Sequence, residues 1–157
     1  MKNIKLILAI TLFTLAFNYT LTAKTICTTP TESEVSALFD RWNESLQTLN
    51  PELVVENYFP ESVLHPTLQD QMVVDKAGKI AYFTKFLQKK PVGKIIERQI
   101  FTGCNYAVDT GIYEFTLTSA EGVTSVVKAR YTFTYELENG KWLITSHTSA
   151  LSPEEIA

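Results

Sequence analysis

The sequence is poor in the residues from which metal sites and nucleophilic sites are most often built. It contains two cysteines and two histidines among 157 residues, with no CxxC or Cys-His spacing. This pattern gives no support to a metal site or to a cysteine nucleophile. Phosphate-binding loops, dinucleotide-binding fingerprints and a Ser-His-Asp order are also missing, so we expect no metal and no cofactor.

The charged residues form no block of one sign. There are 14 Lys and Arg against 17 Asp and Glu, a formal net charge of −3, and they are spread along the chain. A mildly acidic, mixed surface argues against nucleic acid or an anionic membrane as the main partner. With 45% hydrophobic residues and no repeat or low-complexity tract, the composition is that of one globular domain.

One apolar run stands at the N-terminus, where Lys2 and Lys5 lead into residues 6–17 and a small residue, Ala23, follows. The pattern is typical of a signal peptide, and the run is shorter than the roughly 20 residues of a membrane-spanning helix. An uncleaved membrane anchor is the alternative. We assign residues 1–23 to a signal peptide and expect a periplasmic or secreted protein with no membrane attachment after cleavage.

Both cysteines lie in the part of the chain that would be exported. An isolated pair in an oxidising compartment is most simply a disulfide, here between Cys27 and Cys104 across a long loop. Two separate buried thiols are the alternative.

Beyond residue 30 the sequence predicts helices first. Residues 31–34 (TESE) form a capping box, and apolar residues then recur every three or four positions, which predicts a helix of about 17 residues. Asn50 begins a second, short helix and Asp75 caps a third. Between them we expect a short strand at Ser62–His65 and a second short extended piece at Met72–Val74.

From Gly93 onward the apolar period changes to two. Four strands joined by tight turns are predicted, at residues 94–106, 109–119, 123–137 and 141–151. Helices followed by a curled antiparallel sheet indicate an α+β domain, with the first helix over one face of the sheet. We place this domain at residues 32–153, between an N-terminal extension at 24–31 and a tail at 154–157.

Asn139-Gly140 is the strongest turn signal, because both residue types tolerate the positive φ of a type I′ turn. A two-residue turn there places Thr132 opposite His147. Because side chains alternate between faces, one face of the hairpin is then aromatic and the other polar, and the polar face includes Arg130, Thr132, His147 and Ser149. A one-residue bulge would exchange the faces locally.

Three segments carry a family resemblance: FLQKKP at 86–91, ARYTFTY at 129–135 and NGKWLI at 139–144. With the order of elements, they resemble the calcium/calmodulin-dependent protein kinase II association domain, especially its small bacterial, often exported relatives. That family belongs to the nuclear-transport-factor-2-like, or SnoaL-like, superfamily. The resemblance spans about residues 32–153. It implies a cystatin-like cone, in which a curved antiparallel sheet of four long strands packs on an N-terminal helix with two further short helices.

The resemblance also has functional implications. It implies a homodimer or larger homo-oligomer formed through the sheet, a pocket between the sheet and the first helix, and no catalytic activity of the association domain itself. The chain contains no kinase motif. Relatives usually carry a His cluster followed by Ser after the Trp-Leu-Ile strand, and here residues 146–149 read SHTS, with only the middle histidine kept.

Arg130 is the first candidate for ligand binding. A guanidinium on a sheet face beside Thr132, His147 and Ser149 can hold a carboxylate bidentately, and the resemblance adds an Arg at this position in the pocket of the kinase domain. Tyr113 is a further candidate for the pocket wall. The alternative for Arg130 is a structural ion pair with Glu114, Glu136 or a neighbouring subunit.

His147 and His65 are the candidate catalytic residues, and a structural role is the alternative for each. In the related ketosteroid isomerase and polyketide cyclase enzymes, a carboxylate before a proline at the end of the short strand can be the general base. His65-Pro66 occupies that place here. We therefore expect an exported, non-catalytic oligomeric module that binds a small carboxylate or apolar ligand. A small-molecule isomerase or cyclase with His65 or His147 as base is the alternative.

Overall fold

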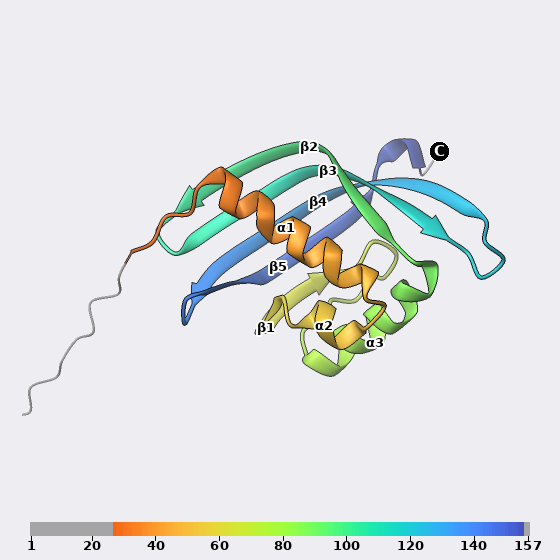
Figure 1. Ribbon diagram of the computed structural model, residues 1–157, viewed down its shortest axis with the longest axis horizontal. Coiled ribbons are helices and arrows are strands. Elements are labelled where there is room, and N and C mark those ends of the chain that lie inside the picture. The colour runs from red at the N-terminus through yellow and green to blue at the C-terminus, as the bar shows by residue number, and fades with distance from the viewer. Residues whose placement is uncertain (1–26, 156–157) are drawn as a thin grey trace, which may run out of the picture.

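The computed structural model describes residues 27–155, and in them the helices precede the long strands (Figure 1). The helices are α1 (Glu32–Gln47), α2 (Pro51–Val55) and α3 (Lys76–Phe86), with 3₁₀ turns at Leu87–Lys89 and Pro153–Glu155. The strands are β1 (Tyr58–His65), β2 (Val92–Gly103), β3 (Tyr106–Thr118), β4 (Thr124–Glu138) and β5 (Lys141–Leu151). The predicted signal peptide lies outside the described residues. Within these residues, no helix has both the length and the apolar character needed to span a bilayer.

The five strands form one mixed sheet in the order β1-β5-β4-β3-β2. Strands β2 to β5 make the predicted antiparallel meander. The short strand predicted at Ser62–His65 is confirmed, but it starts at Tyr58 and joins the sheet as a fifth strand, in a parallel pairing with β5 that was not predicted. Such a pairing joins segments about 80 residues apart, and periodicity within a segment does not report it.

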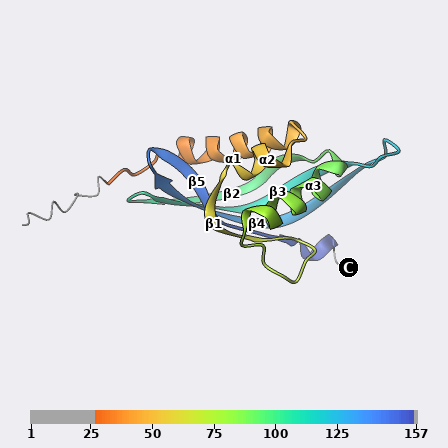
Figure 2. The ribbon, with the colours of Figure 1, turned by 90° about the horizontal axis from the view of Figure 1, so that it is seen from below.

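Helix α1 lies across one face of the sheet, which we call the inner face (Figures 1 and 2). Its start is the predicted capping box, in which Glu34 N donates to Thr31 Oγ1 at 3.2 Å and Thr31 N donates to Glu34 Oε2 at 2.7 Å. One stripe of the helix is buried against the sheet: Val35, Leu38, Phe39, Trp42 and Leu46. The predicted first helix is therefore confirmed, with its apolar stripe facing the core.

Polar contacts fix the orientation of α1 on the sheet. The Asn43 side chain both donates to the Gly93 carbonyl at 2.9 Å and accepts from the Gly93 amide at 2.8 Å. On the other side, Arg41 Nη2 donates to the Trp142 carbonyl at 2.7 Å. These hydrogen bonds connect helix α1 to β2 and to β5, in addition to the packing of its apolar stripe on the sheet.

Helix α3 begins at the predicted cap, where Asp75 Oδ1 accepts from Gly78 N at 2.7 Å. The extended piece predicted at Met72–Val74 is reduced to a single antiparallel bridge between Val73 and Leu64. This bridge holds the segment between β1 and α3 against the inner face, so that α3 and this segment close one end of the fold.

The turn at Asn139-Gly140 is confirmed, with φ values of 49° and 79°. The register beyond it is not the one expected. Tyr135 pairs with Ile144 as predicted, but the pairing then shifts by one residue and Phe133 faces His147. This shift is a one-residue bulge in β5, and it moves His147 to the inner face. The prediction that one polar face holds both Arg130 and His147 is therefore wrong.

The turn between β2 and β3 is also displaced from its predicted place. It lies at Cys104-Asn105, where Asn105 has a φ of 57°, rather than after Tyr106. The predicted disulfide between Cys27 and Cys104 is confirmed, with 5.0 Å between the Cα atoms. Next to it, Thr28 N donates to Asn105 Oδ1 and Asn105 N donates to the Thr28 carbonyl, each at 2.8 Å. The disulfide and these two hydrogen bonds therefore attach the first described residues to the turn between β2 and β3.

Candidate functional site

A cavity of about 430 Å³ lies between the inner face of the sheet, α3 and the segment that follows β1. Most of its wall is apolar or aromatic, including Trp42, Leu64, Phe83, Phe86, Phe115, Ala129 and Leu151. A cavity of this size with a mainly apolar wall is typical of small-molecule sites, provided that a few polar groups converge in it.

Three hydroxyl groups converge on the cavity wall. Tyr113 on β3 donates to Ser149 Oγ on β5 at 2.6 Å, and Ser149 Oγ lies 2.5 Å from Thr67 Oγ1 on the segment after β1. Tyr113 is almost fully buried, and burial raises the pKa of its hydroxyl. The three hydroxyls form one hydrogen-bonded chain, so after its internal bonds are made one proton remains to offer to a ligand.

His147 lines the same cavity and is 4% exposed. Its ring stacks on Phe133, with 4.0 Å between centroids, and meets Trp42 edge-on at 5.3 Å. Nδ1 lies 2.8 Å from the Tyr58 hydroxyl, which also accepts from Trp42 Nε1 at 3.1 Å. Burial lowers the pKa of His147 to about 3, so the imidazole is neutral at pH 7.

The β5 bulge decides which predicted ligand-binding residues meet. Tyr113, His147 and Ser149 come together on the inner face, as side chains of the cavity wall. Arg130 and Thr132 are on the outer face and line a separate hollow with Thr110, Ile112 and Thr148. The five residues predicted as one site are therefore divided between the two faces of the sheet.

His65 also belongs to the outer side of the sheet. It pairs with Thr148, one of the residues of the outer hollow, whereas its neighbour Leu64 is buried and lines the inner cavity. Because adjacent strand residues point to opposite faces, the His65 side chain is directed away from the cavity.

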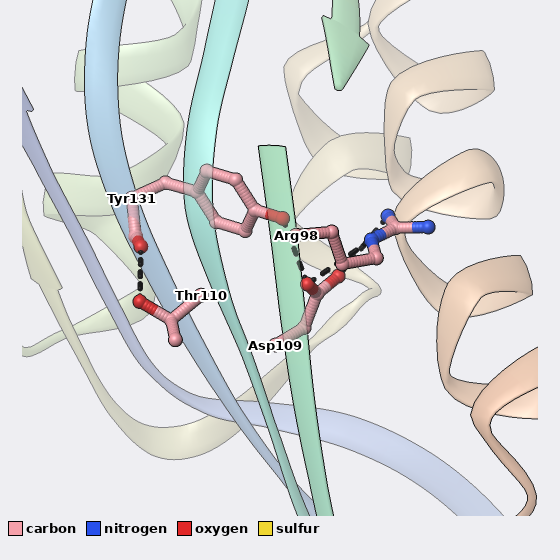
Figure 3. Close-up of polar contacts among 4 residues, drawn as sticks. All are labelled: Arg98, Asp109, Thr110 and Tyr131. Carbon is pink, nitrogen blue, oxygen red and sulfur yellow. Dashed lines mark hydrogen bonds and ion pairs between the residues drawn. The ribbon is translucent and has the colours of Figure 1, made fainter. Parts of the chain in front are cut away.

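A second polar cluster lies on the inner face, and Figure 3 shows Arg98 and Tyr131 converging on the carboxylate of Asp109. Tyr131 OH donates to Asp109 Oδ1 at 2.8 Å, Arg98 Nε donates to the same oxygen at 3.2 Å, and Arg98 Nη2 lies 3.1 Å from Oδ2. Asp109 is fully buried, and this burial raises its pKa, although the hydrogen bond from Tyr131 and the charge of Arg98 offset part of the rise. The guanidinium also lies 5.6 Å from the centre of the Phe39 ring.

Sequence reasoning missed Thr67 and the Arg98–Asp109 pair. Thr67 lies in a loop between elements, where only the tertiary structure brings it to Ser149. The bulge has no signal in the apolar pattern of β5, because apolar residues fall on both even and odd positions: Trp142, Leu143, Ile144, Ala150 and Leu151. A strand whose apolar residues occupy both parities does not reveal an extra residue, so the bulge could be found only from the structure.

Within residues 27–155, no group of three or more His, Cys, Asp or Glu side chains is arranged to hold a metal ion. The polar residues that line the cavity bear hydroxyls, one imidazole and the Gln69 amide, and three charged residues, Lys85, Lys89 and Glu155, belong to the same wall. The site therefore presents hydrogen-bond donors to oxygen acceptors rather than a set of metal ligands.

Three solved structures show the same fold. A candidate calcium/calmodulin-dependent protein kinase II association domain from Xanthomonas campestris is 47% identical, with a TM-score of 0.75 over 77% of this chain and 87% of the other. An iota-carbonic anhydrase from a cyanobacterium, in complex with bicarbonate, is 21% identical, with a TM-score of 0.68 over 84% and 98%. A nuclear transport factor 2-like superfamily protein from Salmonella enterica is 19% identical, with a TM-score of 0.65 over 76% and 89%.

The family is shown by sequence as well as by structure. No curated protein matches the chain. Residues 31–153 match the family model of the calcium/calmodulin dependent protein kinase II association domain, and this range covers the capping box, the three α-helices and all five strands. With the 47% identity to the Xanthomonas campestris protein, this match shows that the chain belongs to the calcium/calmodulin dependent protein kinase II association domain family.

Proposed function

We propose that the protein is a self-associating, non-catalytic module that binds a small, largely apolar molecule through an oxygen acceptor in the inner cavity. The observation that carries this proposal is the convergence of three hydroxyls and the His147 imidazole on an otherwise apolar wall. The polar groups would orient the ligand, and the apolar wall would supply most of the binding free energy.

The ligand class follows from the donors. A carbonyl or carboxylate oxygen can accept from the hydroxyl chain and from the imidazole, whereas a pure hydrocarbon leaves these groups without a partner. The wall carries two lysines, Lys85 and Lys89, against one acid, Glu155, and this excess of positive charge favours a carboxylate. An aromatic carboxylate such as 2-naphthoate combines both features and serves as a probe.

Trp42 provides the readout, because it lines the cavity and Trp142 does not. In a Trp142→Phe background, titration with 2-naphthoate should change the Trp42 fluorescence in a saturable way. Ser149→Ala should weaken binding about tenfold, the value of one hydrogen bond to a charged group. Ser146→Ala, on the outer side of the same strand, is the matched control and should bind like the parent. The absence of any saturable change in the parent protein would contradict the proposal.

Self-association is proposed through the outer face of the sheet. Helices cover the inner face, whereas no helix lies over the outer face within the described residues (Figure 2). Membership of an association domain family supports this part of the proposal. Light scattering on the purified protein should give at least a dimer at micromolar concentration, and a monomer would overturn it.

Export is proposed from the N-terminal pattern and is supported by the disulfide, a bond typical of oxidising compartments. Cleavage after Ala23 would leave a short extension, residues 24–31, ahead of a domain at 32–153. Mass spectrometry of the protein recovered from periplasm or medium should show a chain that starts at Lys24. A chain that retains residue 1 would contradict cleavage.

A second candidate function is the binding and interconversion of carbon dioxide and bicarbonate. The observation that favours it in this chain is the chain of Tyr113, Ser149 and Thr67 hydroxyls beside His147, since planar oxyanions accept several short hydrogen bonds. The cyanobacterial iota-carbonic anhydrase, solved with bicarbonate, has a similar fold. Stopped-flow hydration of carbon dioxide tests this function: wild type should accelerate it and Ser149→Ala should not. A wild-type rate equal to the buffer rate would exclude it.

An isomerase or cyclase receives less support from the geometry. His65 points away from the cavity, and His147 is a weak base because burial lowers its pKa to about 3. One ring nitrogen of His147 is also engaged by Tyr58. His147 is better suited to donate a hydrogen bond than to abstract a proton.

A further inference from the structure

We propose that Tyr58 is a positioning residue that fixes the proton of His147 on Nε2, and so makes the inner cavity selective for ligands with an acceptor oxygen. This inference has two halves, the tautomer of His147 and the selectivity for ligands. The ligand half deepens the proposed function and rests on it. The tautomer itself is a property of the free protein. The two halves can therefore fail separately.

The argument begins at Trp42, whose indole N–H can donate but cannot accept. Trp42 Nε1 lies 3.1 Å from the Tyr58 hydroxyl oxygen, so that oxygen is an acceptor in this contact. The second contact of the hydroxyl is His147 Nδ1, at 2.8 Å. Tyr58 is 5% exposed, so its own proton needs a partner within the protein.

Two arrangements of protons are possible at the Tyr58–His147 contact. If Nδ1 carried the proton, the Tyr58 oxygen would accept from both Trp42 and His147, and its own buried proton would lack an acceptor. If Nδ1 is unprotonated, Tyr58 donates to it and every group in the relay from Trp42 is satisfied. The second arrangement is favoured, and the single proton of the neutral imidazole then resides on Nε2.

The other ring nitrogen of His147, Nε2, makes no hydrogen bond to the described residues. It is buried, although the His147 side chain lines the cavity. The ring cannot turn freely, because Phe133 covers one of its faces at 4.0 Å and Trp42 meets it edge-on. This N–H has a fixed direction and no acceptor in the cavity wall. A ligand that places an oxygen near it would accept a hydrogen bond from it.

The consequence is a preference between ligands of the same shape. A ketone such as 2-acetylnaphthalene offers an acceptor to Nε2–H, and its hydrocarbon counterpart 2-isopropenylnaphthalene does not. The ketone should bind about tenfold more tightly, because only the ketone satisfies the buried donor. Tyr58→Phe removes the hydroxyl that selects the tautomer and should reduce this ratio to about two, with little change in hydrocarbon binding.

Nitrogen NMR tests the tautomer without any ligand. The chain has two histidines, and a His65→Gln variant leaves only the signals of His147. At pH 7, ¹⁵N-labelled protein should show a protonated, pyrrole-type Nε2 and an unprotonated, pyridine-type Nδ1. The reverse pattern in this otherwise wild-type protein overturns the inference, whether or not Tyr58→Phe folds.

The ligand half is tested by titrating the ketone and the hydrocarbon into wild type, Tyr58→Phe and a matched control. Tyr106→Phe removes a hydroxyl from an exposed tyrosine that does not line the cavity, and should keep the wild-type ratio. Equal affinities in wild type with a protonated Nε2 overturn the selectivity. If neither compound binds, the ligand half fails together with the proposed function, and the tautomer assignment is decided by NMR alone.

Discussion

The inner face of the sheet carries two polar clusters that differ in how they are completed. Around Asp109, the carboxylate receives Tyr131 and Arg98 at 2.8–3.2 Å, and α1 covers the cluster through Phe39. Around His147, the groups face a cavity, and Nε2 has no partner among the described residues. The Asp109 cluster is completed by an ion pair within the protein, whereas His147 Nε2 has neither an ion pair nor a hydrogen bond among the described residues.

The difference separates a structural role from a binding role. A buried charge is tolerated when it is paired and hydrogen-bonded, and such a pair fixes the packing around it. An unpaired buried donor is a cost to the free protein that a ligand can remove. The two clusters are adjacent, since the Tyr113 and Tyr131 rings stack with 4.9 Å between centroids. Substitutions at matched positions can therefore test the distinction.

The largest effect on stability is expected from breaking the Arg98–Asp109 ion pair. Arg98→Met leaves the fully buried Asp109 carboxylate without its cation and should lower the free energy of unfolding by about 3–5 kcal/mol. Urea denaturation followed by circular dichroism measures the loss. Arg98→Met combined with Asp109→Leu removes both charges and should recover much of the stability. A loss below about 1 kcal/mol in the single variant would show that the ion pair does not stabilise the fold.

The next effect is a dependence of stability on pH that comes from His147. The pKa of His147 is about 3 in the folded protein against 6.5 for an unperturbed histidine. Between these values the unfolded chain binds a proton that the folded chain does not, so stability falls as the pH is lowered from 6.5 towards 3. The slope should approach about 1.4 kcal/mol for each pH unit. Above pH 6.5 both states are neutral at this residue and its contribution is constant.

His147→Gln isolates this contribution, because glutamine can still accept from Tyr58 but does not titrate. Urea unfolding of both proteins between pH 7 and pH 4 gives the difference. Asp109 acts with the opposite sign, since its raised pKa stabilises the fold towards low pH, and it cancels in the subtraction. A difference that does not change with pH would mean that the folded protein admits a protonated His147.

The comparison also explains what could be predicted from the sequence. The three helices, the capping box and the Asn139-Gly140 turn follow from residues close in sequence, and these predictions were confirmed. The parallel partner of β5 and the meeting of Thr67 with Ser149 depend on contacts across about 80 residues, which no local pattern encodes. The single-residue bulge had the largest consequence, because it moved His147 to the face opposite Arg130.

The two arginines of the sheet show the same limit of local sequence patterns. Arg130 and Arg98 both lie on strands, and their sequence neighbours do not tell which one faces a buried carboxylate. The structure pairs Arg98 with Asp109, its partner two strand positions away across the β2–β3 hairpin, while Arg130 is exposed. Arg130 lies on the polar face together with Thr132, as predicted, and the bulge in β5 instead removes His147 and Ser149 from that face.

Two stacked tyrosines, one in each cluster, provide a matched and smaller test. Tyr131→Phe removes a hydrogen bond to the Asp109 carboxylate and should cost about 1.5–3 kcal/mol of unfolding free energy. Tyr113→Phe removes a bond to the Ser149 hydroxyl and should cost about 1 kcal/mol. Only Tyr113→Phe should weaken the binding of 2-naphthoate. If Tyr131→Phe weakened binding equally, the two clusters would form one functional unit and the distinction would be lost.

The smallest effect is expected at Arg130, whose predicted role in ligand binding remains open. Arg130 lines the hollow on the outer face, and the sheet separates it from Tyr113, His147 and Ser149. Arg130→Ala should therefore change the affinity for 2-naphthoate less than twofold when Trp42 fluorescence is used as the readout, because the removed charge lies across the sheet from the cavity and near solvent. A loss of tenfold or more would place the carboxylate within reach of Arg130. If Ser149→Ala then bound like the parent protein, the ligand would bind on the outer face, and the unpaired nitrogen of His147 would have no role in recognition.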